Sequence, residues 1–431
     1  MVNALSRINR VSISPQTGTP AWDQVENYAA PALTYVDLEM TADSTMTADQ
    51  PRIATTGQRG DGETPLAADG NRDAAISLAF YLRGLDLAGG AGNGISTATA
   101  APQYDAILQQ TTGGTVTNTT GDLAQVGSTR WVVGVVNAAH FAVGNFAGWV
   151  NPAFEMEAMP IVDLDLVANT ITIAGEAVGA TGGFSAAPAA GNVIYASRTY
   201  KLSQQAGERT PLAIHADLAD GNAERFFLGC FGSLGFSDAD GLLLGSFTAQ
   251  AHDWKAASEL VGPPAFGAFV GPTLGPVSTR GGRAIISSAN SWGVTAGTHV
   301  ASPVAIPTVI SGELDVAVDI QPRTAQSGTN GRQGFVAVDN GCAMPLRLYH
   351  DGVTAGLLGF GDASLLSLQE GASLAVARQY GTTPGNVVCA EVPSYQGDAV
   401  LGEEAGLATI DLTGRGYRPS NLNATIRIHL L

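Results

Sequence analysis

Apolar and polar residues alternate in two stretches that lie far apart in the chain. One runs from Ile76 to Leu85 and the other from Met344 to Val353; they align without a gap, with a Tyr and a Gly at matching positions. Each stretch follows a Gln-Pro-Arg tripeptide, at 50–52 and 321–323, and a polar, glycine-containing segment. Because side chains alternate between the two faces of a strand, both stretches are predicted to be β-strands with one apolar face. The recurrence indicates a duplicated unit.

Three further blocks recur in the same order around this pair. Apolar positions and turn residues match between the two copies. The matched blocks are 36–40 with 313–320, 211–222 with 373–386, and 241–254 with 406–417. The first of these blocks is predicted to be a strand with one apolar and one acidic face in both copies. The chain is therefore predicted to contain one module twice.

The recurrence and the turn residues between its blocks predict the domain boundaries. The first copy is interrupted by short apolar strands that the second copy lacks, which predicts a small β domain inserted at an exposed loop. A proline-rich stretch that denies a sheet its N–H donors predicts a linker. The predicted divisions are an N-terminal arm at 1–30, a first module at 31–112 and 198–255, an inserted small β domain at 113–197, a linker at 256–283, and a second module at 284–431.

A short helix is predicted once in each module. In the first copy it covers 102–109, where Pro102 precedes the apolar residues, and proline is favoured at the start of a helix. The stretch 363–368 is its counterpart in the second copy. One helix against an antiparallel sheet in each module predicts a mainly β fold of the α+β kind.

Composition narrows the possible partners. The formal net charge is -17, and Lys201 and Lys255 are the only lysines. A protein that grips nucleic acid needs clustered Lys and Arg, so that role is disfavoured, whereas a surface that nucleic acid slides past is not. The apolar window from Trp131 to Val150 contains polar residues and is predicted to form two strands, so no membrane partner is expected. Arg7 and Arg10 interrupt any secretory signal.

Motifs that carry chemistry do not stand out. Cys230, Cys342 and Cys389 have no metal-ligand spacing, and they are predicted to be core residues of a protein that folds under reducing conditions. The glycines of 90–94 come without the lysine of a phosphate-binding loop. Neither a nucleophile elbow nor an acid–base carboxylate pair is evident. We therefore expect no enzymatic activity and no cofactor or metal.

The alternating strands gather acidic side chains on one face. In the second copy Glu313, Asp315 and Asp319 are predicted to point away from the apolar residues between them. Asp37 and Glu39 show the same spacing in the first copy. Two interpretations remain open, an ordinary solvated face and the acidic wall of a channel.

The polar segment after the first Gln-Pro-Arg is too long for a tight hairpin, and it is expected to project and make contacts. Arg59-Gly60-Asp61 matches an adhesion tripeptide, but its degraded copy at 331–334 favours a structural turn in which glycine supplies a positive φ. The candidate residues for contacts between subunits are Arg52, Arg59, Asp61, Arg323 and Arg332.

Taken together, these features resemble a bacteriophage tail tube protein. The resemblance lies in their order: the Arg-Gly-Asp-Gly loop at 59–62 before an alternating strand, the short helix, the strand Arg225 to Cys230, the strand ending at Trp254, and the strand Gly406 to Tyr417. It covers nearly the whole chain except the insertion. It implies β-sandwich or barrel-like modules, each with a flanking helix, and rings that stack into a hollow tube. Members with a duplicated module form trimeric rings that imitate six-fold symmetry.

The resemblance also implies partners and a location. The chain would be a structural virion protein, made in the host bacterial cytoplasm and carried in the tail. Its partners would be copies of itself in rings and stacked tubes, other tail proteins, and DNA that passes through an acidic lumen without specific binding. Two other functions are weighed beside this one: a tail-tip or capsid-decoration protein, and a surface carbohydrate-binding or adhesive β protein. The inserted domain and the degraded second Arg-Gly motif depart from the simplest tail tube pattern.

Overall fold

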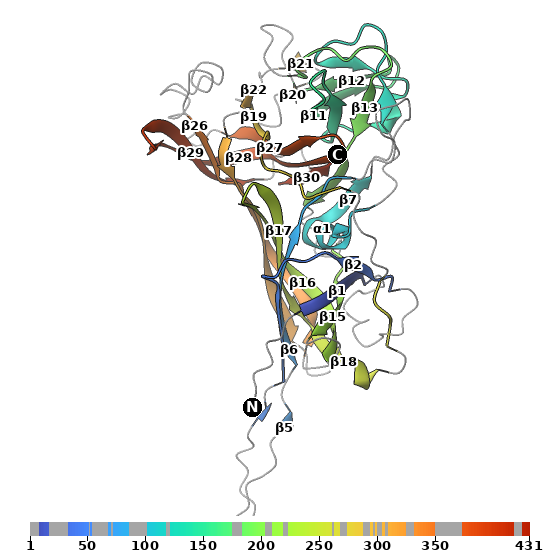
Figure 1. Ribbon diagram of the computed structural model, residues 1–431, viewed down its shortest axis with the longest axis vertical. Helices are drawn as coiled ribbons and strands as arrows, with labels where there is room; N and C mark the ends of the chain where they lie inside the picture. The colour runs from blue at the N-terminus through green and yellow to red at the C-terminus, as the bar shows by residue number, and fades with distance from the viewer. Residues whose placement is uncertain are drawn as a thin grey trace, which may run out of the picture.

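The structure, a computed structural model, is mainly β, which confirms the fold class predicted from the sequence (Figure 1). Within the described residues α1 (Asp105–Thr112) is the one α-helix, and the second predicted helix at 363–368 lies outside them. The described residues are 8–16, 33–50, 52–53, 68–69, 72–85, 101–117, 121–174, 183–202, 209–218, 223–260, 263–267, 274–287, 294–295, 298–299, 304–306, 309–324, 332–349, 373–417 and 425–431.

The first half of the chain supplies α1 and the strands around it. The helix begins later than predicted, because Pro102 accepts a hydrogen bond from Asp105 in a turn that precedes it, and it ends at Gly113, whose φ is 81°. The other elements are β1 (Ile8–Pro15), β2 (Val36–Leu38), β3 (Thr45–Asp49), β4 (Arg52–Ile53), β5 (Ala68–Asp69), β6 (Asp73–Tyr81), β7 (Gly113–Thr117), β14 (Arg198–Leu202), β15 (Leu212–Leu218), β16 (Ala223–Ala239), β17 (Leu242–Ala251), β18 (Asp253–Ala256) and η3 (Ala257–Glu259).

A separate six-stranded sheet lies between β7 and β14 in the sequence, inside the predicted insertion at 113–197. Its elements are β8 (Asp122–Leu123), β9 (Val132–Gly134), η1 (Ala138–His140), β10 (Phe146–Val150), β11 (Met156–Asp165), β12 (Thr170–Ile173) and β13 (Val193–Ala196). The strand order is β8-β13-β10-β11-β12-β9. Phe146 and Phe184 lie in its core, which continues into the second half of the chain through Ala375 and Leu431. The insertion is therefore anchored on the second half.

The second half of the chain is formed of strands alone in the described residues. They are β19 (Arg283–Ser287), β20 (Val294–Thr295), β21 (Thr298–His299), β22 (Val304–Ile306), β23 (Val309–Gly312), β24 (Leu314–Thr324), β25 (Arg332–Ala343), β26 (Leu346–Tyr349), β27 (Leu374–Thr383), β28 (Asn386–Glu404), β29 (Leu407–Gly416) and β30 (Arg427–Leu430). The hairpin of β28 and β29 projects sideways from the body of the molecule (Figure 1).

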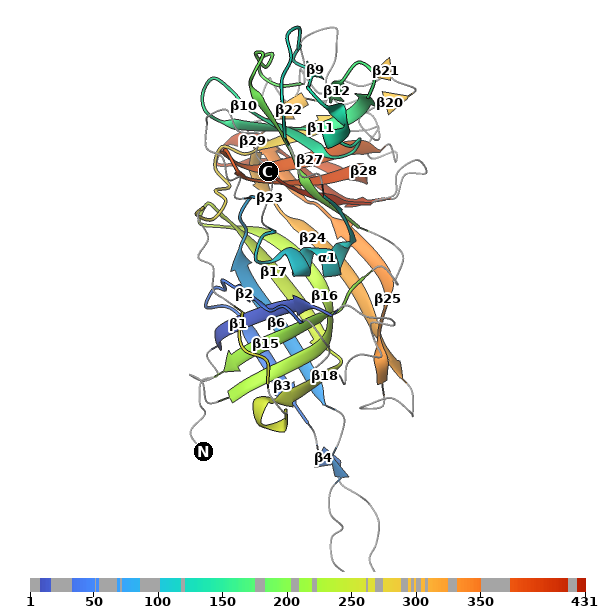
Figure 2. The ribbon, with the colours of Figure 1, turned by 90° about the vertical axis from the view of Figure 1, so that its right-hand side faces the viewer.

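Strands from both halves form one continuous antiparallel sheet, called here the joined sheet. Its order is β3-β6-β17-β16-β24-β25-β29-β28, and β26 continues the line of β25 along β29. The halves meet where β16 pairs with β24, with Gly235 opposite Asp315. Figure 2 shows this sheet curling behind α1. One end is β3, and the other is the 396–404 segment of β28, whose earlier residues pair with β27 and β30.

The two halves pair their strands in the same registers. Both central hairpins turn on two residues of positive φ, Asp240-Gly241 in the first half and Ala405-Gly406 in the second. Counted from these turns, the pairs along β16 and β17 match those along β28 and β29. The matching pairs include Ala239–Leu242 with Glu404–Leu407, Leu234–Phe247 with Ala399–Leu412, and Phe231–Gln250 with Gln396–Arg415. A shift in register also recurs. It lies between Leu212 and Ile214 in the β15–β16 pair and between Leu374 and Val376 in the β27–β28 pair.

One predicted match between the copies is wrong. Residues 36–40 were matched with 313–320, but β2 pairs with β1 whereas β24 belongs to the joined sheet. The counterpart of β2 is β22, which pairs with β19 as β2 pairs with β1. Both segments alternate in hydrophobicity, and a period of two does not identify which strand a segment pairs with.

The predicted linker at 256–283 includes a segment that packs on the first half. Leu243 donates a backbone hydrogen bond to Val277 at 2.9 Å, and Val277 donates one to Leu82 at 2.9 Å. Leu242 and Ser278 form a bridge beside them. The turn end of β16 and β17 is therefore covered by the chain that leads into the second half.

Candidate functional site

The face of the joined sheet opposite α1, called here the outer face, carries small side chains in the first half. Alternation along β6 and β17 buries Phe80 and Phe247 on the α1 side. The intervening positions on the outer face are Ser77, Ser246 and Thr248. These side chains are small and polar, and the bulkier Tyr81 and Leu244, which pair with each other, also lie at partly exposed outer positions of the same strands.

Acidic residues of β24 lie on the same outer face. Glu313, just before the strand, and Asp315 and Asp319 within it are exposed, while Leu314 and Val316 between them are buried. This confirms that the three carboxylates share one solvent-facing surface. Whether that surface is an ordinary solvated face or a channel wall depends on what the chain assembles into.

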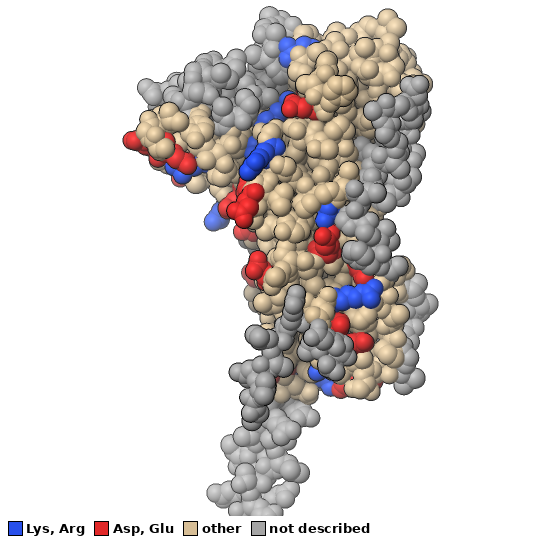
Figure 3. Space-filling view, in the orientation of Figure 1, with Lys and Arg blue, Asp and Glu red and all other residues tan. Residues whose placement is uncertain are grey.

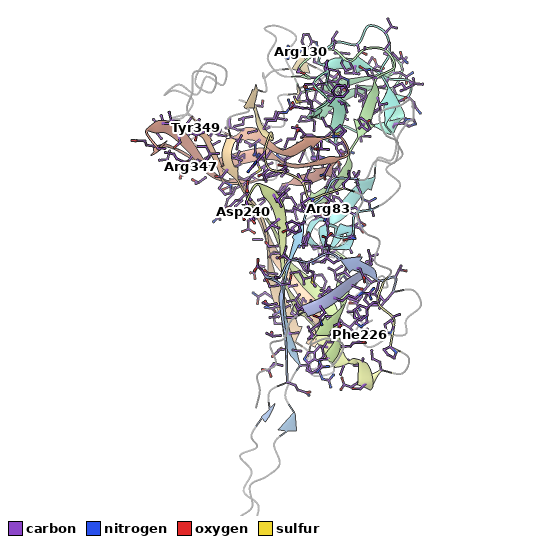
Figure 4. The ribbon with its side chains drawn as sticks, viewed as in Figure 1. Arg83, Arg130, Phe226, Asp240, Arg347 and Tyr349 are labelled. Carbon is purple, nitrogen blue, oxygen red and sulfur yellow. The ribbon has the colours of Figure 1, made fainter. Side chains whose placement is uncertain are left out.

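The outer face continues onto the projecting hairpin with a partly exposed charge cluster. Arg347 of β26 contacts Asp411 at 3.0 Å and Glu404 at 3.4 Å. Figure 4 shows Arg347 and Tyr349 on this arm, and Figure 3 shows acidic side chains at its end. Because these ion pairs are exposed, they contribute little to stability and mainly set the charge of the arm.

Asp37 and Glu39 do not join the outer face, so the prediction of a shared acidic surface is wrong for them. Asp37 is only 3% exposed; it accepts hydrogen bonds from Ser12 and from Arg10, whose Nε lies 2.8 Å from Oδ2. Glu39 forms an ion pair with Arg83 at 2.6 Å. The physical reason is that β2 pairs with β1, away from the joined sheet, and buried carboxylates need such partners.

The candidate residues for contacts between subunits lie near the far ends of two hairpins. Arg52 begins β4, which pairs with β5 (Figure 2). Arg323 lies in β24, and Arg332 begins β25 opposite Thr324. Arg59 and Asp61 lie outside the described residues. Arg52 thus follows the end strand β3, and Arg323 lies near the end of β24.

Sequence reasoning missed the two end strands of the joined sheet. In the described part of the chain, β3 is paired with β6 alone. Val400 and Leu401 of β28 are paired with β29 and are 54% and 56% exposed. The signal that could have identified this edge is an apolar pair between Asp398 and Glu403 in a strand of otherwise alternating character.

A cavity of 640 Å³ lies next to the end strand β3. Residues of β1, of β2 and of the chain leading into β3 line it, among them Arg10, Ser44 and Thr45. The Arg10 side chain is 43% exposed although it pairs with Asp37. This end of the joined sheet therefore combines a strand edge with a hollow whose wall contains Arg10, Asp37 and Glu39.

Other kinds of site find no support in the described residues. No group of three or more His, Cys, Asp and Glu side chains there could hold a metal ion. No helix there is long and apolar enough to cross a membrane. The three cysteines are free and buried, as predicted, and burial raises the pKa of each thiol. Such thiols are poor nucleophiles, because the thiolate is the reactive form.

No protein-family model matches this chain, and no curated protein matches it.

Proposed function

We propose that the chain is the subunit of a bacteriophage tail tube, and that copies of it form rings around a channel lined by the outer face. The observation that carries this proposal is the joined sheet, in which two halves with the same registers follow one another through a β16–β24 pairing. A unit that joins its own halves head to tail, with β3 at one end and the 396–404 segment of β28 at the other, can continue the same contact with further copies. Heterologous contacts of this kind close into rings when the rotation permits.

The chemistry of the outer face supports a channel for DNA. Serine, threonine and glycine over the first half offer no cation to hold a phosphate, and Glu313, Asp315 and Asp319 repel it. The inserted domain packs on β27 and its neighbours in the second half, on the side away from the outer face. It would lie on the outside of the tube.

Electron microscopy of the purified protein at increasing concentration tests the proposal. The expected images are rings of three chains with near six-fold symmetry, stacked into tubes, with the outer face toward the channel in the reconstructed density. A protein that stays monomeric at millimolar concentration would contradict the proposed function. A ring with Asp315 and Asp319 on its exterior would contradict the acidic channel.

A further inference from the structure

We propose that the ring closes by antiparallel pairing of β28 of one copy with β3 of the next, with Val400 opposite Thr47 and Leu401 opposite Met46. This inference rests on the proposed function and names the contact through which a second copy would bind. It follows from the β16–β24 pairing, through which the chain joins its own halves.

The residues of β16 that pair with β24 have their counterparts in β28. Gly235 and Phe236 pair with Asp315 and Leu314. Because the β16–β17 and β28–β29 hairpins have the same register counted from their turns, Gly235 corresponds to Val400 and Phe236 to Leu401. These two residues therefore occupy the same place at the end of the sheet as the residues that join the halves.

The residues of β24 that pair with β16 have their counterparts in β3. Leu78 stands opposite Phe247, and Leu346 stands opposite Leu412, so β6 and β26 correspond. Two residues before Leu78 is Ile76, which pairs with Met46. Two residues before Leu346 is Met344. The last pair of β24 and β25 on this side is Asp315–Ala343, so the next residues in register are Leu314 and Met344. Met46 and Thr47 of β3 thus correspond to Leu314 and Asp315.

The matching positions in β16 and β28 differ in solvent exposure. Phe236 pairs with Leu314 of the second half and is 2% exposed, whereas its counterpart Leu401 is 56% exposed. In Figure 4 Asp240, at the turn after Phe236, lies where the halves meet, whereas the arm that carries β28 and β29 projects into solvent. An exposed edge with apolar side chains favours addition of another strand. The uncovered apolar surface therefore lies at the place where the repeated contact requires a partner.

A cavity lies beside β3 at the place where the tip of the hairpin would arrive. In the proposed register the residues after Leu401 run along Thr45 and Ser44, which line the cavity of 640 Å³. Glu403 is exposed and would arrive beside this cavity, whose wall contains Arg10 together with Asp37 and Glu39. The same register places Asp398 opposite Asp49, so the pairing rests on the matching registers and the exposed apolar edge, not on charge.

Disulfide trapping between two single variants tests the register. One preparation carries Val400→Cys, the other Thr47→Cys, and they are mixed, assembled and oxidised mildly. Directly opposite strand residues have Cα atoms about 4.5–5.5 Å apart, within the range of a disulfide. We expect a covalent dimer on a non-reducing gel. The native cysteines give little background, because all three are buried.

Thr45→Cys mixed with Val400→Cys is the matched control. Thr45 is exposed on the same face as Thr47 but lies diagonally across, about 7–8 Å away, beyond the usual range of a disulfide. Equal trapping by Thr45→Cys and Thr47→Cys would overturn the register. Trapping within the Val400→Cys preparation alone would show β28 pairing with β28 and would also overturn the inference.

Leu401→Asp provides a second measurement. It is expected to lower the fraction of protein in rings by about tenfold or more, because a carboxylate would be buried without a partner. Leu166→Asp, at a 63% exposed position of the inserted domain, should leave assembly unchanged. Rings of wild-type protein that give no Val400–Thr47 trapping and tolerate Leu401→Asp would overturn this inference and leave the proposed function intact. Absence of rings from the wild-type protein itself would overturn the proposed function.

Discussion

The β16–β17 hairpin and the β28–β29 hairpin have the same backbone but different surroundings. Each turns on two residues of positive φ and pairs in the same register. The edge of the first is covered by β24, and its turn end is covered by the segment around Val277. The second projects as an arm, and Leu401 and Leu407 on it are both 56% exposed.

This difference shows that the register within a hairpin and the burial of its outer edge have separate causes. The turn and the alternation of side chains determine which residues face each other across a hairpin. Burial of the outer edge depends on what lies beside the hairpin, and among the described residues β24 lies beside Gly235 and Phe236 whereas no strand is paired there with the outer edge at Val400 and Leu401. Variants at matching positions can therefore measure the two contributions separately.

The largest expected contrast is between Phe236→Ala and Leu401→Ala. Phe236→Ala should lower the free energy of unfolding by about 3–5 kcal/mol, because it leaves a cavity in a packed core. Leu401→Ala should lower it by less than about 0.5 kcal/mol, because the side chain is exposed in the isolated chain. Urea unfolding followed by circular dichroism, below the concentration at which rings form, measures both. Similar losses at the two positions would mean that the hairpins are equally buried.

A second contrast concerns pH and is expected to be smaller. His215 of β15 is stacked between Phe226 and Phe266, with ring centroids 4.1 and 3.6 Å away, whereas β27 has Ala377 at the matching position. Burial, and then the nearby Arg10, lowers the pKa of His215 to about 4. The unfolded chain, in which histidine has a pKa of about 6.5, then binds more protons than the folded chain at acidic pH.

The free energy of unfolding is therefore expected to decrease as the pH falls. The stabilising contribution of neutral His215 is fully present above about pH 6.5 and is lost as the pH falls toward 4, by roughly 2 kcal/mol at pH 5. Urea unfolding of the wild type and of His215→Gln between pH 7.5 and 5 measures it. The variant should lose less stability over this range, because glutamine does not titrate. Parallel curves for the two proteins would rule out His215 as the source.

The smallest effect is expected at the turns. Gly406 has a φ of 84°, and a side chain there would meet no atom within 4 Å, so Gly406→Ala should cost about 1 kcal/mol through the backbone alone. Gly406→Asn should cost less, because asparagine tolerates this conformation. Gly241→Ala should cost at least as much as Gly406→Ala, because its Cβ would also lie 3.1 Å from Nε of Arg280. Thermal melting of the three variants orders these losses, and equal losses from Ala and Asn at Gly406 would contradict the assignment to φ.

Much of the local structure could be predicted from alternation and turn residues. The strand predicted from Ile76 to Leu85 overlaps β6, and the short strands predicted within 113–197 correspond to the six-stranded sheet. The exposure of Asp315 and Asp319 follows from the same period of two, because their neighbours Leu314 and Val316 had to be buried. The three cysteines were correctly placed in the core.

The errors came from the pairing of strands. Asp37 has the same alternating context as Asp315, yet it is buried against Arg10, because β2 lies beside β1. The match of 36–40 with 313–320 failed for the same reason. A period of two specifies which face a side chain occupies, but it carries no information about which strand lies next to it.

By itself, the amino-acid sequence determined that the chain is mainly β, that a module recurs, and which residues share a face of each strand, because turn residues and side-chain alternation act within a few residues of one another. Only the tertiary structure decided that β16 joins β24, that the outer face runs across both halves, and that β3 and β28 are left as ends. These features depend on contacts between residues far apart in the chain, whose cost in conformational entropy is met by the packing of the whole fold.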